Sequence, residues 1–160
     1  MSSLIQLFEQ KGLNYSAYSL SEVSEKNNKY NVFVDNSTYF FSRSDITDQW
    51  WQVTFEVPVL IKSYLMYTSQ NFYGRPKSWI VNASFDNLTW KTVSVATNIE
   101  TYNNKTYIPF EPNSIVCNHL RIILKQNNLN TSGLIFTFFD AIGTISEIGV
   151  KICTCIRKTK

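Results

Sequence analysis

Short runs of alternating apolar and polar residues follow one another along the chain from about residue 30 onward. In one such run Trp79, Val81 and Ala83 fall on one face, and mostly polar residues fall on the other. A period of two with one apolar face predicts a β-strand in a sheet that packs on one side. The strands predicted in this way cover residues 39–42, 50–55, 59–68, 78–84, 91–96, 106–110, 116–125 and 134–139.

Helical periodicity is confined to the N-terminus of the chain. Residues 3–10 place Leu4, Leu7 and Phe8 on one side, and Gly12 follows, so a short helix is predicted that ends at this glycine. The polar segment 16–31 is interpreted as a loop with one weak strand. About eight short strands without helices between them predict an all-β domain, an antiparallel β-sandwich.

The tryptophans of this pattern are interpreted as core residues. Trp50 and Trp79 fall within predicted strands, and Trp90 closes the polar segment after one of them. Because a tryptophan buries a large apolar surface, such positions are more often part of a core than of a site.

The composition supports a single folded domain and excludes several partners. Of the 160 residues, 44% are hydrophobic, 15% aromatic and 17% charged, which is sufficient to form a core. The net charge is only +3, and the basic residues are scattered except at the C-terminus. We therefore expect no nucleic-acid partner, because such proteins carry a basic stripe. No apolar run approaches the roughly 18 residues of a membrane-spanning helix, so no transmembrane segment is expected.

The cysteines and the N-terminus favour a cytoplasmic or other intracellular location. Cys117, Cys153 and Cys155 are an odd number, which is unusual for a secreted domain held by disulfides. The first residues contain neither a basic segment nor a long apolar segment, so no signal peptide is expected. An extracellular location stays open, and the six Asn-x-Ser/Thr triplets would then gain a meaning as acceptors of glycans.

An ordered set of motifs resembles a known family. The motifs are an Asp-Asn loop at 35–36, a tryptophan-led strand at 50–55, Pro-Lys-Ser-Trp at 76–79, Ser-Phe-Asp-Asn at 84–87, Leu-Arg-Ile at 120–122 and Phe-Asp-Ala-Ile-Gly at 139–143. Together they resemble the discoidin, or coagulation-factor type C, domain over residues 13–145, with an N-terminal extension at 1–12 and a basic tail at 146–160. The resemblance implies a jelly-roll sandwich of the galactose-binding-like class. It is closest to the members attached to intracellular adaptor proteins of the BTB type.

The resemblance also implies a non-catalytic binding module that uses loops at one end of the sandwich. The candidate residues in these loops are Tyr39, Phe41, Arg43, Phe72, Tyr73 and Arg75. Aromatic and arginine side chains are typical of protein interfaces, so the first hypothesis is a protein partner. Phe40 and Phe41 have an alternative interpretation as ordinary strand residues, one of them in the core. The alternative function is an exported lectin-like domain that binds carbohydrate or lipid.

Neither catalysis nor zinc binding is expected from the residue pattern. His119 is the only histidine, and in a strand it lies roughly 6.6 Å from Cys117 at Cα, which is too far for a nucleophile and its base. These two residues and the C-terminal cysteines lack the spacers of a typical zinc site.

Calcium is the one cofactor that the resemblance suggests. In related domains a structural Ca²⁺ lies near the first loop, and the matching positions are Asp35 and Asp140. Calcium takes six to eight oxygen ligands, and only these two carboxylates are in view. The alternative is that Asp35 caps its own turn and Asp140 lies at a strand edge.

Overall fold

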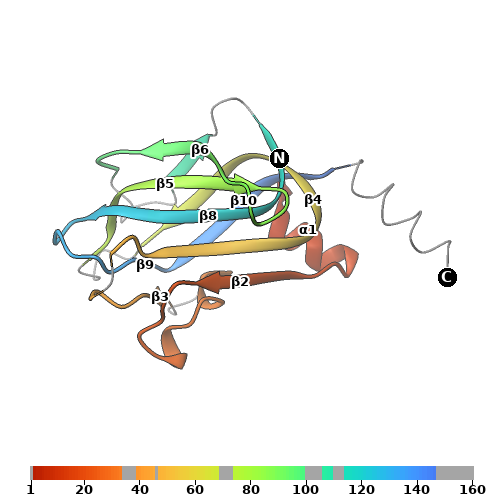
Figure 1. Ribbon diagram of the computed structural model, residues 1–160. Coiled ribbons are helices and arrows are strands. Elements are labelled where there is room, and N and C mark those ends of the chain that lie inside the picture. The colour runs from red at the N-terminus through yellow and green to blue at the C-terminus, as the bar shows by residue number, and fades with distance from the viewer. Residues whose placement is uncertain are drawn as a thin grey trace.

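The computed structural model describes residues 2–33, 39–45, 47–68, 74–99, 106–109 and 114–146, and for 106–109 it describes the backbone alone. These residues form an antiparallel β-sandwich with a short N-terminal helix (Figure 1). The predicted all-β sandwich is confirmed. Within the described ranges, no helix is both long and apolar enough to cross a membrane.

The N-terminal helix forms where the sequence predicts it. After the two-residue strand β1 (Ser2–Ser3), α1 spans Leu4–Lys11. The Ser3 hydroxyl accepts a 3.1 Å hydrogen bond from the backbone N–H of Gln6, which caps the first turn. Gly12 ends the helix in the left-handed conformation at φ 62°, and its N–H donates to the Glu9 carbonyl.

The strands follow the predicted runs with two differences. They are β2 (Tyr15–Ser19), β3 (Phe40–Phe41), β4 (Trp50–Tyr67), β5 (Pro76–Ser84), β6 (Lys91–Ala96), β7 (Thr106–Pro109), β8 (Ile115–Asn127), β9 (Ile135–Phe136) and β10 (Phe138–Ile145), with short 3₁₀ turns at Glu25–Asn27 and Asn31–Phe33. β4 joins two predicted strands into one. The predicted strand 134–139 is divided at Thr137, because the chain forms the short β9 there and then the longer β10, of which the prediction contains only the first two residues.

The long strand β4 belongs to both layers of the sandwich. Its first half pairs with β2 and β8, and its second half pairs with β10 and β7 and, over residues 59–61, still with the start of β8. The register with β8 shifts between Thr54 and Val59, where the strand passes from one layer to the other. We call β2, the first half of β4, β8, β5 and β6 the β8 layer. The β10 layer contains β1, β10, the second half of β4 and β7.

The core lies between the two layers. Trp51 and Trp79 of the β8 layer, and Tyr64 and Phe139 of the β10 layer, are fully buried. The ring centres of Trp51 and Phe139 are 4.8 Å apart. The inner faces of both layers therefore form the core. The opposite, outer face of the β8 layer does not pack against the other layer.

Irregular segments gather at the end of the sandwich opposite α1. Figure 1 shows α1 at one end and β3 and β9 at the other. Segments 20–33, 39–45 and 47–49 lie between β2 and β4 in the chain. Residues 74–75 precede β5, and residues 128–137 connect β8 to β10. We call this the loop end.

Candidate functional site

The first predicted loop is held at the loop end by the connection 128–137. Strand β3 pairs with β9, so that Phe40 lies opposite Phe136. The Ser42 N–H donates a 2.9 Å hydrogen bond to the Leu134 carbonyl, and the Leu134 N–H donates a 2.8 Å bond to the Ser42 hydroxyl. The backbone around Tyr39 to Arg43 is therefore fixed against this connection.

The second predicted loop meets the same connection. The N–H of Gly74 donates a 2.9 Å hydrogen bond to the side-chain oxygen of Asn128, and the N–H of Asn128 donates a 3.0 Å bond to the Arg75 carbonyl. The part of this loop that the structure describes therefore lies at the same end as β3. Phe72 and Tyr73 lie outside the described residues.

The predicted side chains in the described part differ in their surroundings. Tyr39, Phe41 and Arg75 are half-buried. Arg43 is exposed and forms an ion pair with the carboxylate of Asp45. The hydrogen bond from Arg43 lowers the pKa of the Asp45 carboxyl. Arg43 is thus already engaged by a carboxylate, and the role of these residues in binding stays a prediction.

Asn127 shapes the turn at the end of β8. Its side chain is fully buried, and its amide nitrogen donates to the Thr131 hydroxyl at 2.8 Å and to the Gly133 carbonyl at 2.9 Å. Its oxygen accepts from the N–H groups of Leu129 and Thr131. One side chain therefore makes four hydrogen bonds within residues 129–133, which fixes the shape of this turn.

A polar groove lies beside this turn. It has a volume of about 530 Å³ and is lined by Thr47, Asp48, Ser78, Leu124, Lys125, Gln126, Asn130, Thr131 and Ser132. Only Leu124 among these nine is apolar. Lys125 pairs with Asp48 at 3.0 Å, and the amide of Gln126 donates to the Asn130 side-chain oxygen at 3.0 Å. We call this cavity the loop-end groove, and its walls offer hydroxyl, amide and charged groups together.

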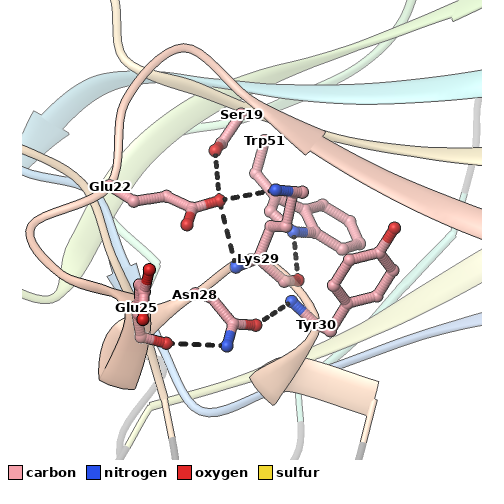
Figure 2. Close-up of polar contacts among 7 residues, drawn as sticks. All are labelled: Ser19, Glu22, Glu25, Asn28, Lys29, Tyr30 and Trp51. Carbon is pink, nitrogen blue, oxygen red and sulfur yellow. Dashed lines mark hydrogen bonds and ion pairs between the residues drawn. The ribbon is translucent and has the colours of Figure 1, made fainter.

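The segment that leads into the loop end is fastened to the core by polar contacts (Figure 2). The Glu22 carboxylate accepts hydrogen bonds from the Ser19 hydroxyl at 3.0 Å and from the Lys29 ammonium at 3.1 Å. The indole N–H of Trp51 donates to the Lys29 carbonyl at 2.9 Å. Asn28 further accepts from the N–H of Tyr30. This network gives the loop end a rigid base, which lowers the entropic cost of binding.

The candidate metal residues do not come together in the described part of the chain. Asp35 lies outside the described residues, and Asp140 is buried in β10 opposite Leu65. Over the ranges that the structure describes, no three His, Cys, Asp or Glu side chains lie close enough to hold a metal ion. The calcium site stays a prediction.

Cys117 and His119 have ordinary structural surroundings. Burial raises the pKa of the Cys117 thiol to about 12, so that the thiolate needed for nucleophilic or metal chemistry is scarce at neutral pH. His119 lies with its Nδ1 2.9 Å from the Thr54 hydroxyl, and partial burial lowers its pKa. The two C-terminal cysteines lie outside the described residues.

The interpretation of all three tryptophans as core residues is wrong for two of them. Trp79 is fully buried, whereas Trp50 and Trp90 are half-buried on the outer face of the β8 layer. Their rings lie on either side of Arg121, whose guanidinium carbon is 4.3 Å from the Trp50 ring centre and 4.0 Å from that of Trp90. The sequence contains a signal for this, since Trp50 and Trp51 are neighbours in one strand and must point to opposite faces.

Comparisons with known proteins agree with this architecture. The family model described as F5/8 type C domain matches residues 16–138. No curated protein sequence matches the chain.

Three solved structures with similar folds are carbohydrate-binding proteins by their descriptions. The family 32 carbohydrate-binding module of Clostridium perfringens NanJ, in complex with galactose, has a TM-score of 0.71 at 15% identity, over 88% of this chain and 97% of that one. A family 32 module of C. perfringens GH89, in complex with GalNAc-β-1,3-galactose, has a TM-score of 0.70 at 13% identity, over 89% and 100%. Chitosan-binding module 1 of a Paenibacillus sp. IK-5 chitosanase/glucanase has a TM-score of 0.69 at 18% identity, over 82% and 96%. At these identities the likeness establishes the fold.

Proposed function

Because the chain belongs to the F5/8 type C domain family and is a non-catalytic binding module, we propose that it binds carbohydrate through the loop-end groove. The observation that carries this proposal is the lining of the groove, in which eight of nine residues are polar. Sugar hydroxyls both donate and accept hydrogen bonds. A wall of hydroxyl, amide, carboxylate and ammonium groups supplies partners for both roles.

The described fold neighbours support the same choice. The module of NanJ was solved with galactose, and the module of GH89 was solved with GalNAc-β-1,3-galactose. Their likeness to this chain is one of fold, so it supports the class of ligand without naming the sugar.

The hypothesis of a protein partner has weaker support. It rests on the aromatic and arginine side chains of the two predicted loops. Among the residues that can be judged, Phe41 is half-buried in a strand and Arg43 is already paired with Asp45. An intracellular location stays a prediction as well.

A glycan array followed by calorimetry tests the proposal. We expect the protein to bind one class of neutral or amino sugar oligosaccharides, and we expect Gln126→Ala to raise the Kd about tenfold, which is the loss of one net hydrogen bond. Lys11→Ala, in the exposed surface of α1 at the opposite end, is the matched control and should leave the Kd unchanged. Absence of binding to every glycan by the folded protein, or equal Kd values for Gln126→Ala and the parent, would contradict the proposal.

A further inference from the structure

The outer face of the β8 layer presents two rows of side chains that run across four strands. The strand registers place Trp50, Ile123, Ile80 and Val95 in one row, and Gln52, Arg121, Asn82 and Thr92 in the next. Val95 is 66% exposed, and most of the other members are half-buried. The first row is apolar and the second is polar, so the face combines the two kinds of contact that a sugar ring uses.

Arg121 is held rigidly at the centre of this face. Its guanidinium carbon lies 4.3 Å from the ring centre of Trp50 and 4.0 Å from that of Trp90, so both indoles contact it. Its Nε and Nη2 donate to the side-chain oxygen of Gln52 at 3.0 and 2.8 Å. Gln52 is only 2% exposed and is itself fixed, because its amide donates to the Thr54 hydroxyl and to the side-chain oxygen of Asn87. The arginine is therefore oriented before any ligand arrives.

The positive charge of Arg121 is left without a carboxylate in the described part of the molecule. No ion pair of Arg121 occurs among the described residues, whereas Lys125 on the same face is paired with Asp48. Two of its guanidinium N–H groups, those on Nη1, have no hydrogen-bond acceptor within the described ranges. A guanidinium with one edge fixed and another edge open is suited to bind a carboxylate.

The four tryptophans divide into two classes by their indole N–H groups. Those of Trp51 and Trp79 are bonded inside the protein, to the Lys29 carbonyl and the Tyr64 hydroxyl. Those of Trp50 and Trp90 have no acceptor among the residues that the structure describes. The outer face thus offers two indole donors beside Arg121 that no acceptor among the described residues takes.

We propose that the cluster of Trp50, Arg121 and Trp90 is a second binding site, which takes the carboxylate of an acidic saccharide. Arg121 would bind the carboxylate through its open edge. The indole rings and the apolar row would pack against the ring carbons of the sugar. The assignment of the carboxylate to a saccharide rests on the proposed function. The anion-binding geometry of Arg121 does not, and none of these three residues lines the loop-end groove.

Nuclear magnetic resonance of the indole N–H groups tests this site directly. The ¹⁵N-labelled protein gives four indole signals, and Trp50→Phe and Trp90→Phe assign two of them. We expect galacturonate to shift the signals of Trp50 and Trp90 and to leave those of Trp51 and Trp79 in place. Galactose, which has the same ring without the carboxylate, and acetate, which has the carboxylate without the ring, should shift them at least tenfold less at equal concentration.

Variants of Arg121 distinguish a role in ligand binding from a purely structural role between the two indole rings. Arg121→Gln should raise the Kd for galacturonate at least tenfold, and Arg121→Lys should raise it less, because it keeps the charge and loses the planar fork. Unchanged signals of Trp51 and Trp79 establish that each variant is folded. Persistence of the galacturonate shifts in Arg121→Gln would overturn the proposal, as would their absence in the parent. Equal shifts with acetate would overturn its saccharide part.

The groove variant keeps the two proposals distinct. Gln126→Ala removes a side chain of the loop-end groove and none of the cluster, so it should leave the galacturonate shifts of Trp50 and Trp90 unchanged. Loss of those shifts in Gln126→Ala would contradict a separate second site. Failure of the groove to bind neutral sugars would contradict the proposed function alone, since the indole signals report on the outer face.

Discussion

Trp79 and Tyr64 join the two layers of the sandwich through a hydrogen bond inside the core. The indole N–H of Trp79 in β5 donates to the phenol oxygen of Tyr64 in β4 at 2.8 Å, and both side chains are fully buried. Burial raises the pKa of Tyr64 to about 12, so the phenol stays protonated throughout the physiological range. The polar tips of these two buried side chains therefore satisfy each other.

Tyr64→Phe should destabilise the fold by about 1–3 kcal/mol, because it removes the acceptor and leaves a buried indole N–H without a partner. Urea unfolding followed by tryptophan fluorescence measures the change. Tyr30→Phe is the control, since Tyr30 is 46% exposed, and it should stay within about 0.5 kcal/mol of the parent. Equal stabilities of the two variants would show that the Trp79 indole finds another acceptor.

Substitution of Asn127 should lower both stability and carbohydrate affinity, whereas substitution of Gln126 should lower affinity alone. Asn127→Ala removes four hydrogen bonds of a fully buried side chain, so we expect a loss of about 2–3 kcal/mol. The turn at 129–133 forms one wall of the loop-end groove, so carbohydrate affinity should fall as well. Gln126→Ala should lower affinity at nearly unchanged stability. Thermal unfolding and calorimetry on both variants separate the effects, and equal stabilities would refute the role of Asn127.

The predictability of the fold depended on how each strand is buried. β5 contains the predicted residues 78–84, where Trp79, Val81 and Ala83 are buried and the two residues between them are half-buried. The predicted strand 134–139 ended too early for β10, because Phe139, Ala141 and Ile142 form a stretch that is buried on both faces and has no period of two. The continuity of β4 was missed because Pro58 interrupts the pattern at the point where the strand changes layers.

The predictability of the site was lower because it depends on contacts between distant segments. The first predicted loop and the described part of the second, which contains Arg75, lie at the loop end, and the order of strands alone could suggest this. The groove depends on Asp48 in the left-handed conformation, at φ 52°, and on the turn that Asn127 organises. Arg121 belongs to the Leu-Arg-Ile motif, but its position between two tryptophans depends on the pairing of β4 with β8.

Asp86 should make the stability of the β5–β6 turn dependent on pH. Its carboxylate accepts hydrogen bonds from the N–H groups of Thr89 and Leu88 and from the Ser84 hydroxyl, and these bonds hold its pKa well below the ordinary value. Because this carboxyl has a lower pKa in the folded protein than in the unfolded chain, its ionised form stabilises the fold at pH values above the unfolded pKa of roughly 3.9. The stabilisation is lost as the pH falls toward the folded pKa.

Asp86→Asn should therefore lower the Tm at pH 7, and the difference from the parent should shrink as the pH falls below about 4. Differential scanning calorimetry between pH 2.5 and 7 provides the measurement. Asp45→Asn, which removes an exposed carboxylate paired with Arg43, shows how much of the effect belongs to any surface ion pair. A difference between Asp86→Asn and the parent that is constant over this range would refute the assignment.

Gly143 has a physical reason to be glycine that its motif does not reveal. It lies in β10 where the register with β4 shifts after Ile142. A Cβ atom at this position would lie 2.0 Å from the carbonyl oxygen of Leu60 and 3.0 Å from its carbon. Because both contacts are with backbone in the middle of a strand, no side-chain rotation relieves them.

Gly143→Ala should consequently destabilise the fold by at least about 2–3 kcal/mol, at the upper end of overpacking costs, or prevent folding. Gly12→Ala measures the cost of a positive φ without a steric clash, because no atom lies within 4 Å of a Cβ at this position and only its φ of 62° is unfavourable. We expect that variant to lose about 1 kcal/mol. Thr144→Ala, at the exposed neighbouring position, should stay within about 0.5 kcal/mol of the parent. Urea unfolding of the three variants measures the order, and a Gly143→Ala protein as stable as Gly12→Ala would mean that β10 and β4 do not approach as closely as described.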